Sequence, residues 1–168
     1  MNFEEANRTW SYEPDTGILR WKIKPAYRVL VGDVAGCKKS NKGGYSYMSI
    51  SFKGKQYKAH KIAWLIFYGV PPKHQIDHED GNSVNNRIEN LRDVTQIENG
   101  RNQKLSTRNT SGFCGVRWQK KMKAWVATIV INGKPIYLGR FYEKNDAIIT
   151  RQIAQEKFGF HKNHGLKR

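Results

Sequence analysis

The sequence is poor in acidic residues. It contains 14 Asp and Glu against 30 Lys and Arg among 168 residues, which gives a net charge of +16. Such an excess of positive charge favours binding to polyanions, and nucleic acid is the commonest of these. The plainest alternative is a generally basic protein, such as one associated with ribosomes.

Cysteines and long apolar runs are also scarce. Cys37 and Cys114 lie far apart and form no Cys-x-x-Cys pair, which argues against a zinc ribbon. Residues 1–5 lack the basic start and apolar run of a signal peptide, and no apolar stretch approaches membrane-spanning length. We therefore expect a cytoplasmic protein with reduced cysteines and no membrane partner.

The positive charge is unevenly distributed. Residues 1–103 carry 16 basic and 11 acidic residues, whereas residues 104–168 carry 14 basic and only 3 acidic residues. With the polar, basic composition at the junction, this predicts an N-terminal domain over 1–103, a linker over 104–111, a second domain over 112–160 and a basic tail over 161–168. The first domain has a net charge of +5, and the second domain together with the linker and the tail has a net charge of +11.

The first 70 residues have the pattern of a small antiparallel sheet followed by a helix. Residues 12–17 place Pro and Gly at turn positions. The other segments assigned from the pattern are strands at 18–22, 45–52 and 56–59, a turn at 53–55, and an exposed Gly- and Lys-rich loop at 33–44. Apolar residues at helical spacing predict a helix over 59–69, which Gly69 and two following prolines end.

Residues 74–103 carry a pattern of strand, loop, strand and helix. Strands are expected at 75–78 and 91–94, and the loop between them is rich in asparagine. Thr95 begins a Thr-x-x-Glu capping box, so a helix should start there and place Asn99 in its first turns.

An acid lies directly beside a histidine in the first of these strands. Because side chains alternate along a strand, Asp77 and His78 should point to opposite faces and cannot both bind one cation without distortion. We therefore expect Asp77 to bind a divalent cation together with the amide oxygen of Asn99. His78 is then the general base that activates water, and Asn90 holds the loop or orients the His78 ring.

These residues resemble the HNH homing endonucleases, particularly the phage and intron-encoded kind. The matching motifs are Ala59-His60-Lys61-Ile62-Ala63, Ile76-Asp77-His78-Glu79-Asp80-Gly81-Asn82, Asn86-Arg87-Ile88-Glu89-Asn90-Leu91, Val94-Thr95 and Glu98-Asn99. The resemblance implies a ββα-metal finger with His78 as general base and Asp77 and Asn99 as metal ligands. It makes Asn90 the central, loop-fixing asparagine. Asn99 replaces the final His of the family name, which favours magnesium or manganese over zinc.

Other residues near this segment have two interpretations. His60 matches a family position, and is either catalytic or packed beneath the site. Arg87 and Arg101 are candidates for phosphate contact in a chain with many basic surface residues. Glu79 and Asp80 either solvate a turn or assist the metal through water.

Residues 112–160 have the pattern of three strands and a helix. The expected elements are strands at 115–119, 124–131 and 135–141, and a helix at about 144–158. Asn132-Gly133 joins the last two strands and is a strong hairpin signal. The expected core contacts of the helix are Ala147, Ile149, Ile153, Ala154 and Phe158.

This part of the chain, 111–159, resembles the plant ethylene-response-factor (APETALA) DNA-binding domain. The resemblance rests on Gly115-Val116-Arg117-Trp118, Ala124-Trp125-Val126-Ala127-Thr128-Ile129, Ile136-Tyr137-Leu138-Gly139-Arg140-Phe141 and Asp146-Ala147. It implies that one sheet face enters the major groove. The candidate DNA contacts are Arg117, Trp118, Thr128, Val130, Tyr137 and Arg140 in the strands, and Lys120, Lys121 and Lys123 in the first hairpin loop. Thr128 and Val130 replace charged residues of the plant pattern, so the plant sequence preference should not transfer.

The sequence therefore predicts an α+β protein with an HNH nuclease domain that includes an N-terminal antiparallel sheet, followed by a three-stranded antiparallel sheet packed on one helix. We expect a metal-dependent endonuclease that nicks or cuts duplex DNA. A catalytically silent DNA-binding regulator and an RNA- or ribosome-binding protein are the alternatives. The sequence leaves open whether a phage or host protein is a partner, and whether the protein is a monomer or a dimer.

Overall fold

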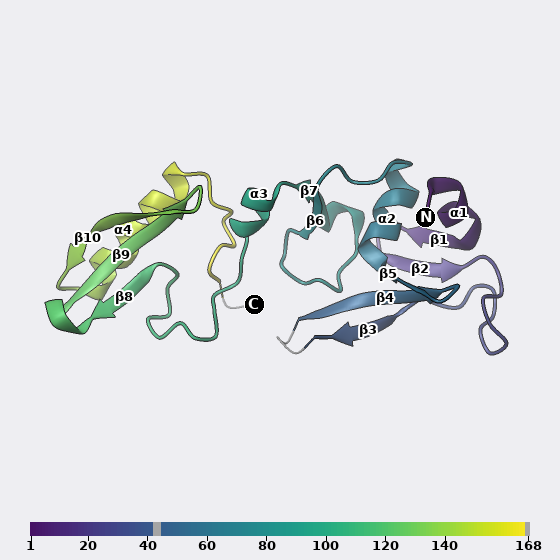
Figure 1. Ribbon diagram of the computed structural model, residues 1–168, viewed down its shortest axis with the longest axis horizontal. Coiled ribbons are helices and arrows are strands. Elements are labelled where there is room, and N and C mark those ends of the chain that lie inside the picture. The colour runs from purple at the N-terminus through teal and green to yellow at the C-terminus, as the bar shows by residue number, and fades with distance from the viewer. Residues whose placement is uncertain (42–44, 167–168) are drawn as a thin grey trace. The chain divides into compact units, whose positions relative to one another are not determined.

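The computed structural model describes residues 1–41 and 45–166 (Figure 1). These residues form helices and several small antiparallel sheets, which confirms the predicted α+β class. The chain divides into two compact units, Met1–Thr95 and Gln96–Arg168, whereas the sequence placed the end of the first domain at residue 103. Within the described ranges, no helix has both the length and the apolar character needed to cross a membrane.

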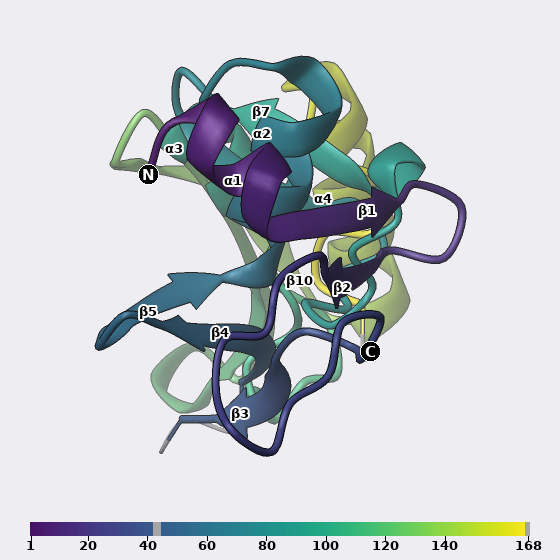
Figure 2. The ribbon, with the colours of Figure 1, turned by 90° about the vertical axis from the view of Figure 1, so that its right-hand side faces the viewer.

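The first unit contains three small antiparallel sheets and two α-helices. Its elements are α1 (Phe3–Thr9), β1 (Trp10–Glu13), β2 (Ile18–Trp21), β3 (Cys37–Ser40), β4 (Ser46–Phe52), β5 (Lys55–Lys58), α2 (Ala59–Tyr68), β6 (Gln75–His78), the 3₁₀-helix η1 (Ile88–Asn90) and β7 (Leu91–Val94). The sheets are β1–β2, β3–β4–β5 and β6–β7. Helices α1 and α2 pack against each other (Figures 1 and 2).

Aromatic side chains fill the core of the first unit. Trp10 is completely buried, and its ring lies 5.4 Å from the rings of both Trp21 and Phe52, measured between centroids. Ala6 of α1 and Ile62 of α2 belong to the same buried cluster. This core ties the N-terminal helix and the first two strands to α2, which carries His60.

Two features of the first unit differ from the sequence prediction. The loop predicted over 33–44 is wrong in part, because Cys37–Ser40 forms the fully exposed edge strand β3; residues 42–44 lie outside the described residues. Exposure on all four residues explains why no apolar alternation marks this strand. Helix α1 was not predicted, although Asn2 caps it by accepting a hydrogen bond from the Glu5 amide at 2.9 Å.

The second unit contains a short helix and a three-stranded sheet with one long helix. Its elements are α3 (Gln96–Gly100), β8 (Val116–Gln119), the 3₁₀-helix η2 (Lys120–Met122), β9 (Ala124–Ile131), β10 (Lys134–Phe141) and α4 (Lys144–Lys157). The strand order is β8–β9–β10, all antiparallel, and α4 packs on the sheet. Asn132 and Gly133 both have positive φ, as the predicted tight hairpin requires.

The buried residues of α4 are two alanines and an arginine. Ala147 and Ala154 are buried as predicted, but Ile149 and Ile153 are 53% and 61% exposed, so their assignment to the core was wrong. A period of 3.6 residues places Arg151 with the two alanines and turns the isoleucines away. Arg151 occupies a buried position that the sequence analysis did not single out.

The segment predicted as a linker, 104–111, lies inside the second unit. The Leu105 amide donates to the Leu166 carbonyl at 3.1 Å, and the Gly165 amide donates to the Gln103 carbonyl at 2.8 Å. Residues 103–105 therefore run beside the C-terminal segment. Cys114 in this unit and Cys37 in the first are both free thiols.

Candidate active site

The β6–β7 hairpin positions the acid and the histidine. Asp77 pairs with Arg92 across the two strands, and the next pair joins His78 to Leu91. The Asp77 carboxylate accepts a hydrogen bond from the Arg92 guanidinium at 2.5 Å, and its side chain is 11% exposed. Arg92 thus fixes the carboxylate on one side of the strand, while alternation turns the neighbouring His78 to the other.

His78 is buried and held by an asparagine. Its Nε2 lies 3.1 Å from Oδ1 of Asn86, and because an amide oxygen only accepts, this contact selects the tautomer with the proton on Nε2. In that tautomer the lone pair is on Nδ1. Burial lowers the pKa of His78 below its ordinary value, although the Asn86 contact and the charges of Asp77 and Asp80 oppose this shift. The ring is therefore neutral at neutral pH and is able to accept a proton.

His60, at the start of α2, packs edge-to-face against His78 with 5.2 Å between ring centroids. Burial lowers the pKa of His60 to about 3, and repulsion from His78 when that ring is protonated, and from Lys58 and Lys61, acts in the same direction. His60 is thus a neutral ring under His78. Of the two interpretations from the sequence, the geometry favours packing beneath the site.

Asn90 holds the loop between β6 and β7. Its side-chain oxygen accepts from the Asp80 amide at 2.9 Å, and its Nδ2 donates to Oδ1 of Asp80 at 3.0 Å and to the Asn85 carbonyl at 2.8 Å. Burial alone would raise the pKa of Asp80, but hydrogen bonds from Asn85, Asn82 and Asn90 outweigh it and lower that pKa. Both oxygens of Asp80 are engaged inside this loop, so its role is to shape the loop.

Asn86 and the residues that support it were not among the predicted site residues. The Tyr12 hydroxyl donates to the Asn86 carbonyl at 2.7 Å, and burial raises the pKa of Tyr12, which keeps this donor protonated. The Ile88 amide donates to the Pro14 carbonyl at 3.1 Å. A Cβ on Gly17 would lie 2.5 Å from the carbonyl carbon of Asn86. The turn between β1 and β2 is therefore packed against the backbone that presents Asn86 to His78.

The two predicted metal ligands, Asp77 and Asn99, both offer oxygen donors. In the described parts of the chain, no three His, Cys, Asp or Glu side chains gather into a metal-binding group. Asp77 supplies a fixed carboxylate, and the predicted second ligand, Asn99, lies on α3, which belongs to the second unit. A carboxylate and an amide oxygen fit a hard cation such as magnesium or manganese.

The sheet of the second unit has one face toward α4 and one face free of it. Val116 lies opposite Ala127 in register, and both pack with Ala147 of α4. Val126, the residue before Ala127, pairs with Arg117 on one side and with Arg140 on the other. Because side chains alternate along a strand, both arginines lie on the sheet face that α4 does not cover.

Further candidate DNA contacts lie on that second face. Thr128 pairs with Tyr137, which is 60% exposed, and Val130 is 57% exposed. Lys120 and Lys121 are exposed in η2, where the chain turns from β8 to β9. Arg117, Thr128, Val130, Tyr137 and Arg140 thus lie on one face, and Lys120 and Lys121 lie in an adjoining turn.

Trp118 differs from these residues. Its ring lies edge-to-face on Trp125 with 5.4 Å between centroids, and Trp125 packs on the core cluster beneath α4. Trp118 is therefore on the helix-bearing face, 46% exposed, and not beside Arg117 and Arg140. Lys144 lies over the Trp125 ring at 5.4 Å from its centroid.

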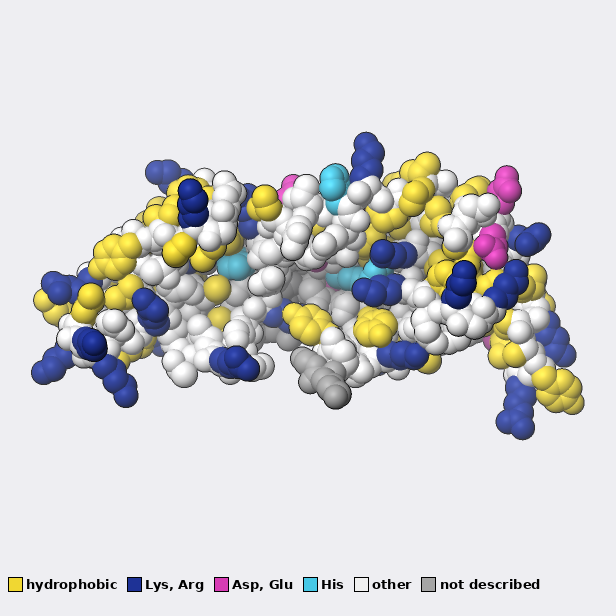
Figure 3. Space-filling view, viewed as in Figure 1, with side chains coloured by type: hydrophobic (Ala, Val, Ile, Leu, Met, Phe, Trp, Pro, Cys, Tyr) yellow, Lys and Arg dark blue, Asp and Glu magenta, His cyan; other side chains and the backbone are white. Residues whose placement is uncertain are grey.

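The two remaining arginine candidates have different surroundings. Arg87 is exposed and lies 3.9 Å from Glu89, too far for a hydrogen bond. Arg101 packs its guanidinium carbon 5.5 Å from the centroid of the Phe160 ring. On the face seen in Figure 3, lysine and arginine side chains are spread widely and few acidic ones are visible.

Comparison with known proteins assigns the family. Residues 57–101 match the family described as HNH endonuclease. The chain is also 40% identical to Protein 3.8 of Escherichia phage T7 over 82 residues, which are 46% of this chain and 68% of that relative. The chain belongs to the HNH endonuclease family.

A solved structure, "DNA binding and cleavage by the HNH homing endonuclease I-HmuI", is similar to this chain at 21% identity with a TM-score of 0.42. The similarity covers 95% of this chain and 82% of that chain. The family match includes His60, Asp77, His78, Asn90 and Asn99 and ends at Arg101. The β8–β10 sheet and α4 lie beyond the matched residues.

Proposed function

We propose that this HNH endonuclease hydrolyses phosphodiester bonds in duplex DNA in the manner of a homing endonuclease, with a single divalent cation. The observation that carries the proposal is the state of His78. The ring is buried, neutral and fixed by Asn86, one residue from a carboxylate on the opposite face of the same strand. A general base beside a cation ligand is the arrangement that metal-assisted hydrolysis needs.

In this mechanism His78 accepts the proton of the attacking water at Nδ1, while Nε2 keeps its proton for Asn86. Asn86 thereby fixes the ring and stabilises the imidazolium as it forms. Asp77 and Asn99 would hold the cation, magnesium or manganese, which stabilises the negative charge on the phosphate and the leaving oxygen when bound. Asn90 acts at a distance, as a positioning residue for the loop.

We further propose that the second unit holds duplex DNA through the sheet face that carries Arg117 and Arg140. These two exposed arginines lie on either side of Val126, with Tyr137 nearby on the outer strand. Arginine pairs bidentately with guanine or with phosphate, and the lysines of η2 suit contact with the backbone. The few acidic residues after residue 103 give this part of the chain an excess of positive charge, which favours contact with phosphates.

The test is nicking of a supercoiled plasmid with magnesium or manganese. We expect His78→Ala to lose cleavage and keep DNA binding. His74→Ala, purified in the same way, is the matched control, because His74 is an exposed histidine four residues earlier. Full cleavage by His78→Ala would refute the general base.

A wild-type protein that binds DNA but never cuts with either metal would favour the catalytically silent regulator. Preference for structured RNA over duplex DNA at fixed salt would favour an RNA-binding protein instead.

A further inference from the structure

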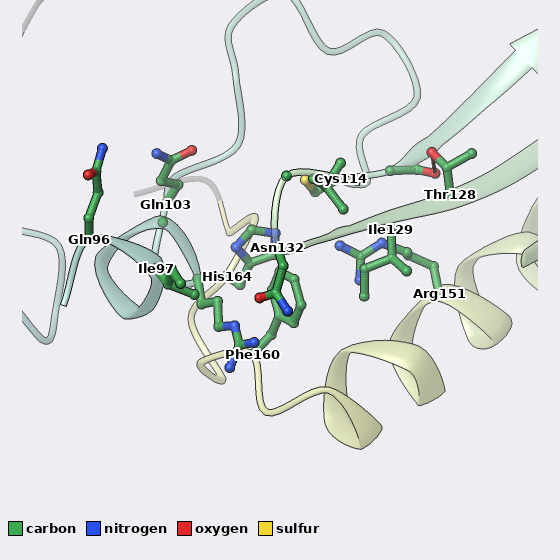
Figure 4. A pocket seen from close by; sticks show the side chains of 15 residues that line it. Gln96, Ile97, Gln103, Cys114, Thr128, Ile129, Asn132, Arg151, Phe160 and His164 are labelled. Atoms are coloured by element: carbon green, nitrogen blue, oxygen red, sulfur yellow. Dashed lines mark hydrogen bonds between the residues drawn. The ribbon is translucent and has the colours of Figure 1, made fainter. Parts of the chain in front are cut away.

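The second unit contains a cavity of about 630 Å³, whose lining includes three of the candidate DNA contacts, Arg101, Thr128 and Val130. Arg151 of α4 lines it and is only 2% exposed. Within the described residues, neither Nε nor Nη1 of Arg151 has a hydrogen-bond partner. Figure 4 shows its guanidinium directed toward the side of the cavity that Asn132 and Phe160 line. Two unpaired nitrogens on a buried guanidinium are costly, so an occupant that pairs with them would be stabilised.

A second arginine faces the same ring. The guanidinium carbons of Arg151 and Arg101 lie 5.2 Å and 5.5 Å from the centroid of Phe160, and both residues line the cavity. Among the described residues that line it, there is no Asp or Glu. Burial also lowers the pKa of Arg151, which reflects the unfavourable setting of its charge. A cavity lined by two cations and by no Asp or Glu favours an anionic ligand.

The backbone makes room for this arrangement. Gly115 has φ +77°, and a Cβ there would lie 2.5 Å from Nε of Arg151 and 2.3 Å from the Thr128 carbonyl oxygen. Only glycine allows the arginine to extend along β9 into the cavity. The buried position of Arg151 therefore depends on a specific residue of another element.

We propose that this cavity binds a nucleotide phosphate monoester, with the phosphate on Arg151 and the base against apolar walls, while Arg101 contributes positive charge to the lining. Ile97 and Ile129 contribute those walls, and the amide of Asn132 lines the same space. A volume of about 630 Å³ is in the range of small-molecule sites. The ligand is either a free mononucleotide or the 5′-phosphorylated end of a DNA strand, which share this chemistry. The proposal is independent of the cleavage reaction.

Calorimetric titration of the full chain with dAMP, deoxyadenosine and inorganic phosphate tests the site. We expect dAMP to bind one site per chain, and deoxyadenosine and phosphate to bind at least about tenfold more weakly. Arg151→Met should weaken dAMP by about tenfold or more, because a charge-assisted hydrogen bond is lost. Arg108→Met is the matched control, since it removes one exposed arginine outside the cavity and should leave the affinity unchanged.

A 5′-phosphorylated oligonucleotide and its 5′-hydroxyl form distinguish the two sources. A preference for the phosphorylated end that Arg151→Met abolishes, with no dAMP binding, identifies a strand end as the ligand. The same titrations of Arg101→Met measure the effect of a less buried arginine of the cavity, and they replace those of Arg151→Met if that variant does not fold. The proposal is overturned if no phosphorylated probe binds, if inorganic phosphate equals dAMP, or if neither pocket variant changes the affinity.

Discussion

Replacing Gly17 by alanine should damage the support of His78 from a distant part of the first unit. Gly17 has φ +76°, and a Cβ there would lie 2.5 Å from the Asn86 carbonyl carbon and 2.6 Å from the Arg87 amide nitrogen. Such distances force either the turn or the backbone at Asn86 to move. The positive φ costs alanine about 1–2 kcal/mol. Overpacking adds about 1–3 kcal/mol, so the first unit should lose roughly 2–5 kcal/mol in total.

Gly54→Ala separates the two causes. Gly54 has φ +74°, almost the same backbone conformation, but no described atom lies within 4 Å of a Cβ at this position. It should lose only the conformational part, about 1–2 kcal/mol. Native-state hydrogen exchange at the amides of β1 and β2 measures the free energy of unfolding of this unit.

The rate of DNA cleavage should also differ between the two glycine variants. Gly17→Ala should nick plasmid DNA about tenfold or more slowly, the usual effect of disturbing a residue that orients an active-site group. Gly54→Ala should cut at nearly the wild-type rate at a temperature where both variants are folded. If the two variants lose equal stability and cleave equally fast, the turn does not support Asn86 and the reasoning fails.

Three further outcomes are expected. Asn86→Ala should slow cleavage about 10–100-fold with DNA affinity unchanged in a gel-shift assay, because His78 loses the partner that fixes its tautomer. Between pH 6.5 and about 3 the unfolded chain binds a proton at His60 that the folded chain does not, so stability falls as the pH drops through this window. His60→Phe should reduce that loss, measured as the difference in urea midpoints between about pH 7 and about pH 4.5. Arg117→Ala should weaken DNA binding by about 1–3 kcal/mol if the side chain reads a base, whereas Trp118→Ala should lower the unfolding temperature and leave the DNA affinity nearly unchanged.

Local pattern sufficed for much of the fold. The β6–β7 pair, α2 with Gly69 as its left-handed C-cap, and the Asn132–Gly133 hairpin all follow from turn residues and periodicity within a few positions. Strand alternation also separated Asp77 from His78. These features depend on neighbours in sequence, which is why they were accessible without a structure.

Features set by distant residues were not accessible. Asn86 rather than Asn90 contacts the His78 ring, because Tyr12 and the turn at Gly17 fix the Asn86 backbone. In α4 the apolar residues Ile149 and Ile153 suggested a core face, yet the sheet selects the small alanines and Arg151. Composition alone does not reveal either choice.

The contact between Tyr12 and Asn86 spans 74 positions of the chain. During synthesis the β1–β2 turn emerges long before the loop that it supports, so the active site cannot be complete until nearly all of the first unit has left the ribosome. A fragment limited to residues 57–101 would contain His78 and Asn86 without the hydroxyl and turn that hold them. The support of His78 is therefore gated by completion of a long-range fold, and a partly synthesised first unit lacks it.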